Sequence, residues 1–261
     1  MSEGRLTIVG MGIKLITQST IETRAAIQGS QKVYFLSPDL VSARWIAELN
    51  PSAESLNTFL KPGGVRLTAY AAMVDRILTS LQEGMDVCAV FYGHPGVLVY
   101  PAREALRRAR GQGFEVKMLP AISAEDCLFA DLAIDPGEGG CQSFEASDFL
   151  ISRRPPDVTC HLVLWQIGVI GQPLHRGEDT SETFSREALH MLVDHLITHY
   201  GPTHQVTLYE APLYVMCSPR ISYLPLAKLT ETSISQYVTL FIPRLRRRER
   251  DPEVLRKLRD L

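Results

Sequence analysis

Short apolar stretches alternate with longer amphipathic ones through the first 120 residues, and few folds accept such a pattern. The apolar stretches have the length of buried strands, and the amphipathic ones repeat their apolar residues at helical spacing. Strands that alternate with helices predict an α/β fold with a parallel sheet. Residues 5–13 are expected to form a strand followed by a turn, and further strands are expected over residues 32–37, 86–93 and 114–120. The expected helices are residues 18–30, 42–50, 68–84 and 103–113.

A second α/β group of elements follows residue 120. Ser123 is expected to cap a helix over residues 123–133, because two acidic residues follow it in the first turn. Further along, a helix is expected over residues 185–201, and strands over residues 160–171, 205–214 and 236–243. The sequence therefore predicts an N-terminal α/β domain over 1–119, a C-terminal α/β domain over 120–243, and a charged tail over 244–261. Two such halves suggest a ligand cleft between them.

Composition excludes several classes of function. A net charge of −2 argues against a general nucleic-acid binder, which needs many cationic contacts to phosphate. No apolar run is long enough to cross a bilayer, and the N-terminus reads as a strand, not as a signal peptide. The five cysteines form no CxxC pair, which favours a reduced, cytoplasmic protein with buried thiols and no metal site.

Two other motifs are interpreted conservatively. Gly10 and Gly12 follow the first strand, as in a dinucleotide fingerprint, but the third glycine of GxGxxG is absent. The second strand also lacks the terminal acid that holds a ribose, so a nicotinamide or flavin site is disfavoured. His195 and His199 lie four apart on a predicted helix without the HExxH pattern, and we interpret them as surface or edge histidines.

The charged tail, residues 244–261, predicts a solvated terminal helix. The alternative interpretation is a docking surface for a partner subunit or an acidic peptide.

Two stretches indicate a ligand site. The loop Tyr92–Gly96, "YGHPG", joins a strand to a helix, and such loops carry ligands in α/β sheets. Arg66 and Tyr70 lie four apart at a helix start, so their side chains share a face. An arginine and two phenols around one cavity could deprotonate a weak acid. The alternative is structural: a tight turn, an arginine at a helix start, and a tyrosine half in the core.

The run "YGHPGVLVYPAREALRRARGQGFEVKMLPAISAEDCLFADLAIDPGEGGCQSFEASDFL" closely resembles the borosin-type peptide backbone N-methyltransferases, a branch of the tetrapyrrole (corrin/porphyrin) methylase superfamily. The stretches "HLVLWQIGVIG", "VTLYEAP" and "YVTLFIP" match as well, so the resemblance extends from Leu6 to about Pro243. It implies a two-domain enzyme that takes a methyl group from S-adenosylmethionine, with S-adenosylhomocysteine as product and no metal. Its substrate would be the backbone amides of a ribosomally made precursor peptide.

The resemblance also implies site residues. The catalytic residues would be Arg66, Tyr70 and Tyr92. The cofactor pocket would include Tyr92, His94, Val97, Ser123, Ala124, Gln166, Thr207, Val238 and Thr239. In many members the substrate is fused as a C-terminal extension. Because the sequence ends at Leu261 without an apolar core peptide, we expect the split form, in which a separate precursor binds in trans. The family also suggests a homodimer, and a 2:2 complex with such a precursor.

One departure from the family pattern concerns the stretch before Arg66. Related enzymes usually carry one or two more tyrosines there, whereas this chain has Asn57, Phe59 and Leu60. Two rival functions therefore stay open. One is another methylation reaction of the superfamily, on a tetrapyrrole, a modified residue or a ribosomal RNA ribose. The other is a non-catalytic binding module that kept the fold and lost turnover.

Overall fold

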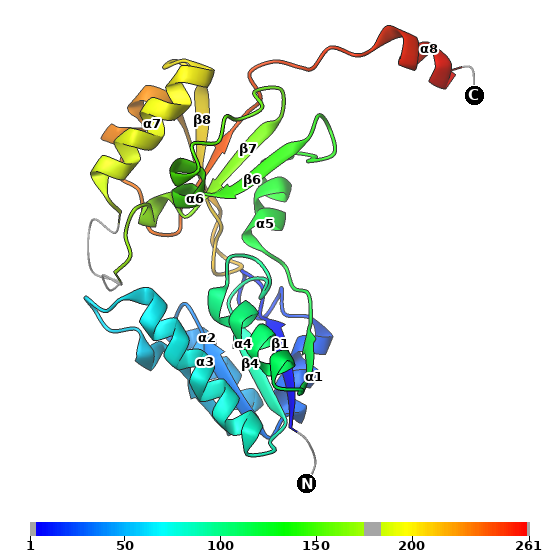
Figure 1. The fold of residues 1–261 in the computed structure, drawn as a ribbon, viewed down its shortest axis with the longest axis vertical. Coiled ribbons are helices and arrows are strands. Elements are labelled where there is room, and N and C mark those ends of the chain that lie inside the picture. Colours follow the sequence, from blue (N-terminus) through cyan, green and yellow to red (C-terminus); the bar gives the residue numbers. More distant parts are fainter. Residues whose placement is uncertain (1–3, 175–183, 260–261) are drawn as a thin grey trace. The chain divides into compact units, whose positions relative to one another are not determined.

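The computed structural model describes residues 4–174 and 184–259, which form two compact units (Figure 1). The first unit contains the chain up to Ala133 and takes in two short later segments, residues 172–174 and 211–220. One hydrogen bond that ties the later segments to this unit runs from Leu15 N to Leu213 O, at 2.9 Å. The second unit contains the remainder of the described chain. The units are therefore not continuous in sequence.

The first unit is built on a five-stranded parallel sheet in the order β3-β2-β4-β1-β5. Its strands are β1 (Arg5–Gly10), β2 (Lys32–Leu36), β3 (Ala53–Ser55), β4 (Val87–Phe91) and β5 (Glu115–Met118). Its helices are α1 (Ile21–Gly29), α2 (Leu40–Leu49), the 3₁₀ helix η1 (Leu56–Phe59), α3 (Arg66–Gln82), α4 (Tyr100–Gly111) and α5 (Ala124–Asp131). The strands and helices predicted for this part of the chain are confirmed. Strand β3, with three residues, was too short to show a pattern.

Strand β4 is apolar throughout because both of its faces are buried. Successive side chains of a strand point to opposite faces of the sheet. Val87, Ala89 and Phe91 pack in the core beneath α3 and α4, whereas Cys88 and Val90 pack in the core beneath α1 and α2. The sheet is thus covered on both faces, as parallel sheets generally are.

The second unit holds a mixed sheet in the order β6-β7-β10-β8-β9. β6 runs parallel to β7, while β10 is antiparallel to both β7 and β8. Its strands are β6 (Cys141–Glu145), β7 (His161–Trp165), β8 (Gln205–Glu210), β9 (Arg220–Pro225) and β10 (Thr239–Ile242). Its helices are α6 (Ala146–Ile151), η2 (Ile167–Val169), α7 (Arg186–Tyr200), η3 (Leu226–Glu231) and α8 (Pro252–Arg259). The mixed α/β fold with two sheets confirms the predicted fold class.

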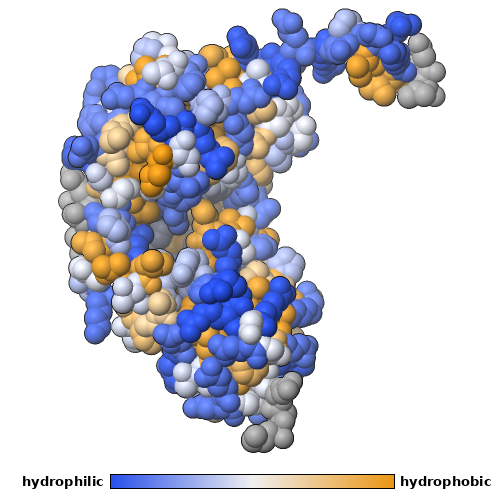
Figure 2. Space-filling view, in the orientation of Figure 1, coloured by the Kyte–Doolittle hydropathy of each residue, from blue (hydrophilic) through white to orange (hydrophobic). Residues whose placement is uncertain are grey.

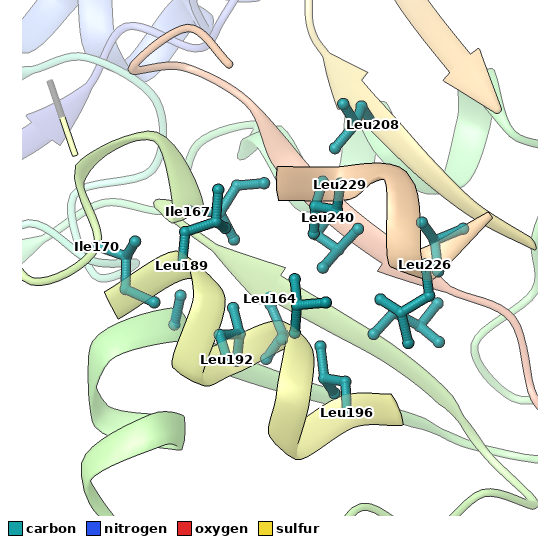
Figure 3. Close-up of a cluster of buried hydrophobic side chains, with 14 of the residues drawn as sticks. Leu164, Ile167, Ile170, Leu189, Leu192, Leu196, Leu208, Leu226, Leu229 and Leu240 are labelled. Atoms are coloured by element: carbon teal, nitrogen blue, oxygen red, sulfur yellow. The ribbon is translucent and has the colours of Figure 1, made fainter. Parts of the chain in front are cut away.

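Helix α7 covers one face of this sheet. Figure 3 shows its Leu189, Leu192 and Leu196 near Leu164 of β7 and Leu240 of β10, and all five are buried. The 3₁₀ helix η3 adds Leu226 and Leu229 to the same core.

Two predictions about the second unit can now be compared with the structure. Helix α8 buries none of its described residues, which confirms a solvated helix in the tail; residues 260–261 lie outside the described part. Figure 2 shows hydrophilic side chains over most of this helix. His195 lies at a helix edge, where its Nε2 pairs with Arg154 O at 2.9 Å and its ring packs on Phe149.

Within the described residues, no helix is long and apolar enough to cross a membrane. The same residues contain no group of three or more His, Cys, Asp or Glu side chains placed to hold a metal ion.

Candidate active site

Arg66 and Tyr70 occupy the first turn and a half of α3. The preceding residue, Val65, provides no side-chain cap. The exposed N–H of a helix start needs an acceptor, and here Arg66 N donates to Pro173 O at 3.1 Å. Val65 and Leu174 also form an antiparallel bridge. A segment distant in sequence therefore fixes where α3 begins, and with it the position of both candidate residues.

The functional atoms of this pair make few hydrogen bonds to the part of the chain that the structure describes. Arg66 Nε donates to Leu174 O at 3.4 Å, but no described residue accepts a hydrogen bond from its Nη1 or Nη2. A guanidinium has five N–H donors, and residues 4–174 and 184–259 use only one of them here. The Tyr70 ring is half-buried against the α3–α4 core, and among the described residues its hydroxyl has no hydrogen-bond partner. The two side chains share one face of the helix, as the spacing predicted.

A cavity of about 430 Å³ opens beside the start of α3. It lies between the first turns of the helix and the segment that leads into it. Its lining residues are Thr58, Phe59, Lys61, Gly64, Val65, Thr68, Ala69 and Ala72. Val65, Thr68 and Ala72 line this cavity and Arg66 and Tyr70 do not, so it opens on a neighbouring face of α3.

The stretch before Arg66 has a structural role that its sequence did not reveal. Asn57 Nδ2 donates to Ser37 O at 2.9 Å, and Asn57 Oδ1 accepts from Ser37 N at 3.2 Å. This double hydrogen bond fastens η1 to the end of β2. Phe59 and Leu60 pack partly buried against the α3–α4 core. The three residues that stand near the absent tyrosines therefore act as anchors in this chain.

The loop that carries Tyr92 is held by glycines. Gly93 N donates to Gly12 O at 3.0 Å and Gly12 N donates to Gly93 O at 3.3 Å, so the loops after β4 and β1 form a short bridge. Both glycines have positive φ, at 69° and 76°, which side chains disfavour. A Cβ on Gly10 would lie 2.1 Å from Gly93 O. Gly10 and Gly12 are therefore explained by the approach of this loop, without a dinucleotide.

His94 and Val97 form the turn that follows. Gly96 N donates to His94 Nδ1 at 2.9 Å, and Val97 N donates to His94 O at 3.1 Å. An Nδ1 that accepts from a backbone N–H carries no proton, so the neutral ring holds its proton on Nε2. The Val97 side chain is exposed. This turn presents one hydrogen-bond donor and one apolar side chain.

Ser123 and Ala124 begin helix α5, as the capping pattern predicted. Ser123 Oγ donates to Asp126 Oδ2 at 2.6 Å, and Asp126 N donates back to Ser123 Oγ at 3.3 Å. Ser123 N also donates to Asp126 Oδ2, at 2.7 Å, which completes a capping box. The Ser123 hydroxyl therefore takes part in capping α5, and a ligand at this position would mainly contact backbone atoms.

The second unit gathers the other candidate residues along β7, β8 and β10. Gln166 follows β7 in the left-handed conformation, with φ 61° and ψ 29°, and its side chain is exposed. The β7–β10 register, continued by two pairs beyond Leu240 and Leu164, places it opposite Val238. A Cβ on Gly168 would lie 1.9 Å from Ser235 O, so only glycine lets this turn pack under the segment before β10.

Thr207 and Thr239 share the sheet face opposite the α7 core. Leu208 and Leu240, their neighbours in sequence, point into that core, and side chains alternate along a strand. The register pairs Thr207 with Phe241 and Thr239 with Tyr209, which puts both threonines on one face. Both are at least 96% buried, with exposed fractions of 3% and 4%.

Known proteins are similar in sequence to almost the whole chain. The family model "Tetrapyrrole (Corrin/Porphyrin) Methylases" matches residues 5–211. The chain is 38% identical over 259 residues to the methyltransferase/ribosomally synthesized cyclic peptide omphalotin A precursor of Omphalotus olearius, covering 98% of the chain and 61% of that protein. It is 37% identical over 259 residues to the corresponding gymnopeptides precursor of Gymnopus fusipes, with the same coverage. The chain thus spans about three fifths of the length of these relatives.

A solved structure shows the same fold at low identity. The uroporphyrin-III-C-methyltransferase of Thermus thermophilus superposes with a TM-score of 0.62, at 13% identity and 93% coverage of each chain. At that identity the likeness concerns the fold alone. With the family model matched over residues 5–211, the chain belongs to the tetrapyrrole (corrin/porphyrin) methylase family.

Proposed function

We propose that the protein is a methyltransferase that moves a methyl group from S-adenosylmethionine to backbone amide nitrogens of a precursor peptide. The observation that carries the proposal is the Arg66–Tyr70 pair, one helical turn apart, whose Nη donors and phenol hydroxyl bond to no described residue. The names of relatives at 37–38% identity, which combine methyltransferase with cyclic-peptide precursor, support it.

An amide nitrogen is a weak nucleophile, because its lone pair is delocalised into the carbonyl. Its reaction requires removal of the N–H proton and stabilisation of the charge that develops on the carbonyl oxygen. The Tyr70 hydroxyl, as phenolate, would accept the proton. The Nη donors of Arg66 would bind the carbonyl oxygen, in the manner of an oxyanion hole.

Tyr92 would position the amide. It stands at the carboxyl end of β4, where ligands bind in parallel sheets, and the Gly12–Gly93 bridge fixes its backbone. Holding the reacting groups in one geometry contributes up to roughly 7–11 kcal/mol in favourable cases. Rigid support of this loop would therefore contribute to the rate through positioning.

The residues proposed for the cofactor suit an adenosyl sulfonium compound. The set is neutral and rich in hydrogen-bonding groups: the exposed Gln166 amide, the Nε2 proton of His94, and the hydroxyls of Thr207 and Thr239. Such groups match ring nitrogens and ribose hydroxyls, and Val97 and Val238 add apolar contact, with Ser123 and Ala124 at the start of α5. The cofactor would supply a methyl group on a positively charged sulfur.

Methyl transfer can be tested with the separate precursor expected in trans. The chain is co-expressed with each small open reading frame beside its gene, and both products are weighed by intact mass spectrometry. We expect methyl increments on the peptide with the parent chain and none with Tyr70→Phe or Arg66→Lys, since lysine lacks the planar fork. Tyr223→Phe, on an exposed tyrosine of β9, is the matched control and keeps full activity.

Other outcomes would redirect the assignment. Increments on the chain itself would replace the trans arrangement with self-methylation. Binding of S-adenosylmethionine, measured by calorimetry, without any methylated peptide would favour another substrate of the family or a binding module. Sedimentation of the purified chain tests the expected homodimer independently of activity.

A further inference from the structure

Tyr100 is the first residue of α4 and stacks on Tyr70. Their ring centroids lie 6.0 Å apart, with an angle of 27° between the ring planes. This separation falls in the range of favourable aromatic pairs. No spacing in the sequence connects residues 70 and 100. The contact exists because α3 and α4 lie side by side on one face of the sheet (Figure 1).

Side chains of the two helices contact each other at three positions along their length. Near the middle, Arg108 pairs with Asp75 at 2.8 Å. Near the far ends, Gln82 Nε2 donates to Gln112 Oε1 at 2.9 Å. Because residue numbers rise together along both helices, α3 and α4 run parallel and begin at the same edge of the sheet. The Tyr70–Tyr100 stack is the third contact, and it lies at the N-terminal ends of both helices, near Arg66.

Tyr70 depends on such a contact for its orientation. Its hydroxyl has no hydrogen-bond partner among the described residues, and the contacts that orient the side chain there are ring packing. One side of the ring meets the α3–α4 core. The Tyr100 ring supplies a second contact, and 39% of Tyr100 remains exposed. Without Tyr100, the Tyr70 ring would lose this contact and gain rotational freedom about its side-chain bonds.

We infer that Tyr100 is a positioning residue, whose ring holds Tyr70 in the orientation that proton removal requires. This inference rests on the proposed function for its effect on rate. The stack itself can be measured without any substrate. The ring is the part that acts, so phenylalanine at position 100 should replace tyrosine, and serine should not.

The first measurement is spectroscopic. 3-Fluorotyrosine is placed at position 70, and its ¹⁹F NMR signal is recorded in the parent, in Tyr100→Phe and in Tyr100→Ser. We expect the signal of Tyr100→Phe to stay near that of the parent, and the signal of Tyr100→Ser to move toward free fluorotyrosine. A Tyr100→Ser signal that stays at the parental position in a folded protein overturns the inference, whether or not the protein methylates peptides.

The second measurement is the rate of methyl transfer, with Tyr223→Ser as the matched loss of an exposed tyrosine. Tyr100→Ser should lower kcat about tenfold, which is near the upper range for one aromatic pair. Affinity for S-adenosylmethionine and the unfolding transition should stay close to those of Tyr223→Ser, and Tyr100→Phe should keep the parental kcat. Equal losses in Tyr100→Phe and Tyr100→Ser overturn the inference, because they assign the effect to the hydroxyl. An inactive parent would reject the proposed function, and the NMR result would still decide the positioning role.

Discussion

Replacing Gly10 by alanine tests whether the Tyr92 loop is held as closely as the structure shows. The added Cβ would lie 2.1 Å from Gly93 O, 2.6 Å from Ala121 Cβ and 2.7 Å from Pro95 Cδ. Ordinary contact begins at 3.4 Å, so the carbonyl must retreat by about 1.3 Å, the difference between 3.4 Å and 2.1 Å. None of these three neighbours is the flexible end of a long side chain, so the loop backbone itself must move.

Two consequences of Gly10→Ala can be given magnitudes. Overpacking of this kind destabilises a protein by about 1–3 kcal/mol. A displacement near 1 Å in a catalytic group lowers rates by up to about 100-fold. We therefore expect a folded protein with reduced stability and a far larger loss of methyl transfer, because the shift falls on the loop that carries Tyr92.

The matched control for Gly10→Ala is Gly29→Ala. A Cβ on Gly29 would meet nothing within 4 Å, and the residue ends helix α1 of the same unit. Gly29→Ala should leave the rate of methyl transfer unchanged, and it should leave stability unchanged or raise it slightly. Urea unfolding gives the free energy of unfolding, and the peptide assay gives the rate. Parental stability and rate in Gly10→Ala would refute the reasoning about the loop.

The remaining predictions concern charge and thiols. Hydrogen bonds from Arg76 to Glu54, at 2.8 and 2.9 Å, lower the pKa of that carboxyl, with help from Lys32. Its ionised form therefore stabilises the fold at neutral pH, and this contribution is lost as pH falls through its folded-state pKa. Glu54→Gln should cost roughly 0.5–1 kcal/mol in urea unfolding at pH 7 and less at pH 3; an equal cost at both pH values would contradict the ion pairing. Burial raises the pKa of the Cys88 thiol to about 12, whereas Cys217 is exposed. A thiol reagent at pH 8 should modify Cys217 at once and Cys88 only after unfolding, and fast labelling of Cys88 in the folded protein would count against the described core.

Much of the fold follows from local patterns. The alternation of apolar and amphipathic stretches predicted the strands and helices around α3 and α4, and Ser123 with its acidic neighbours predicted the start of α5. These features depend on residues close together in sequence. Strand β6 was missed because it is an edge strand of five residues, only partly buried, in a stretch rich in glycine.

The parts that could not be predicted depend on long-range contacts. Arg66 begins α3 because Pro173 O, over 100 residues away, accepts its N–H. Gly10 is required because a loop 80 residues later approaches its Cα. Tyr100 reaches Tyr70 only through the parallel packing of two helices. The sequence indicated which residues to examine, and the folded chain shows which of them touch.

The most direct test of the account is to locate the added methyl groups by tandem mass spectrometry of the co-expressed peptide. The account predicts methyl groups on backbone amide nitrogens with the parent chain, and their absence with Tyr70→Phe. Methyl groups on side chains, or undiminished backbone methylation by Tyr70→Phe, would contradict the assignment of the Arg66–Tyr70 pair to amide N-methylation.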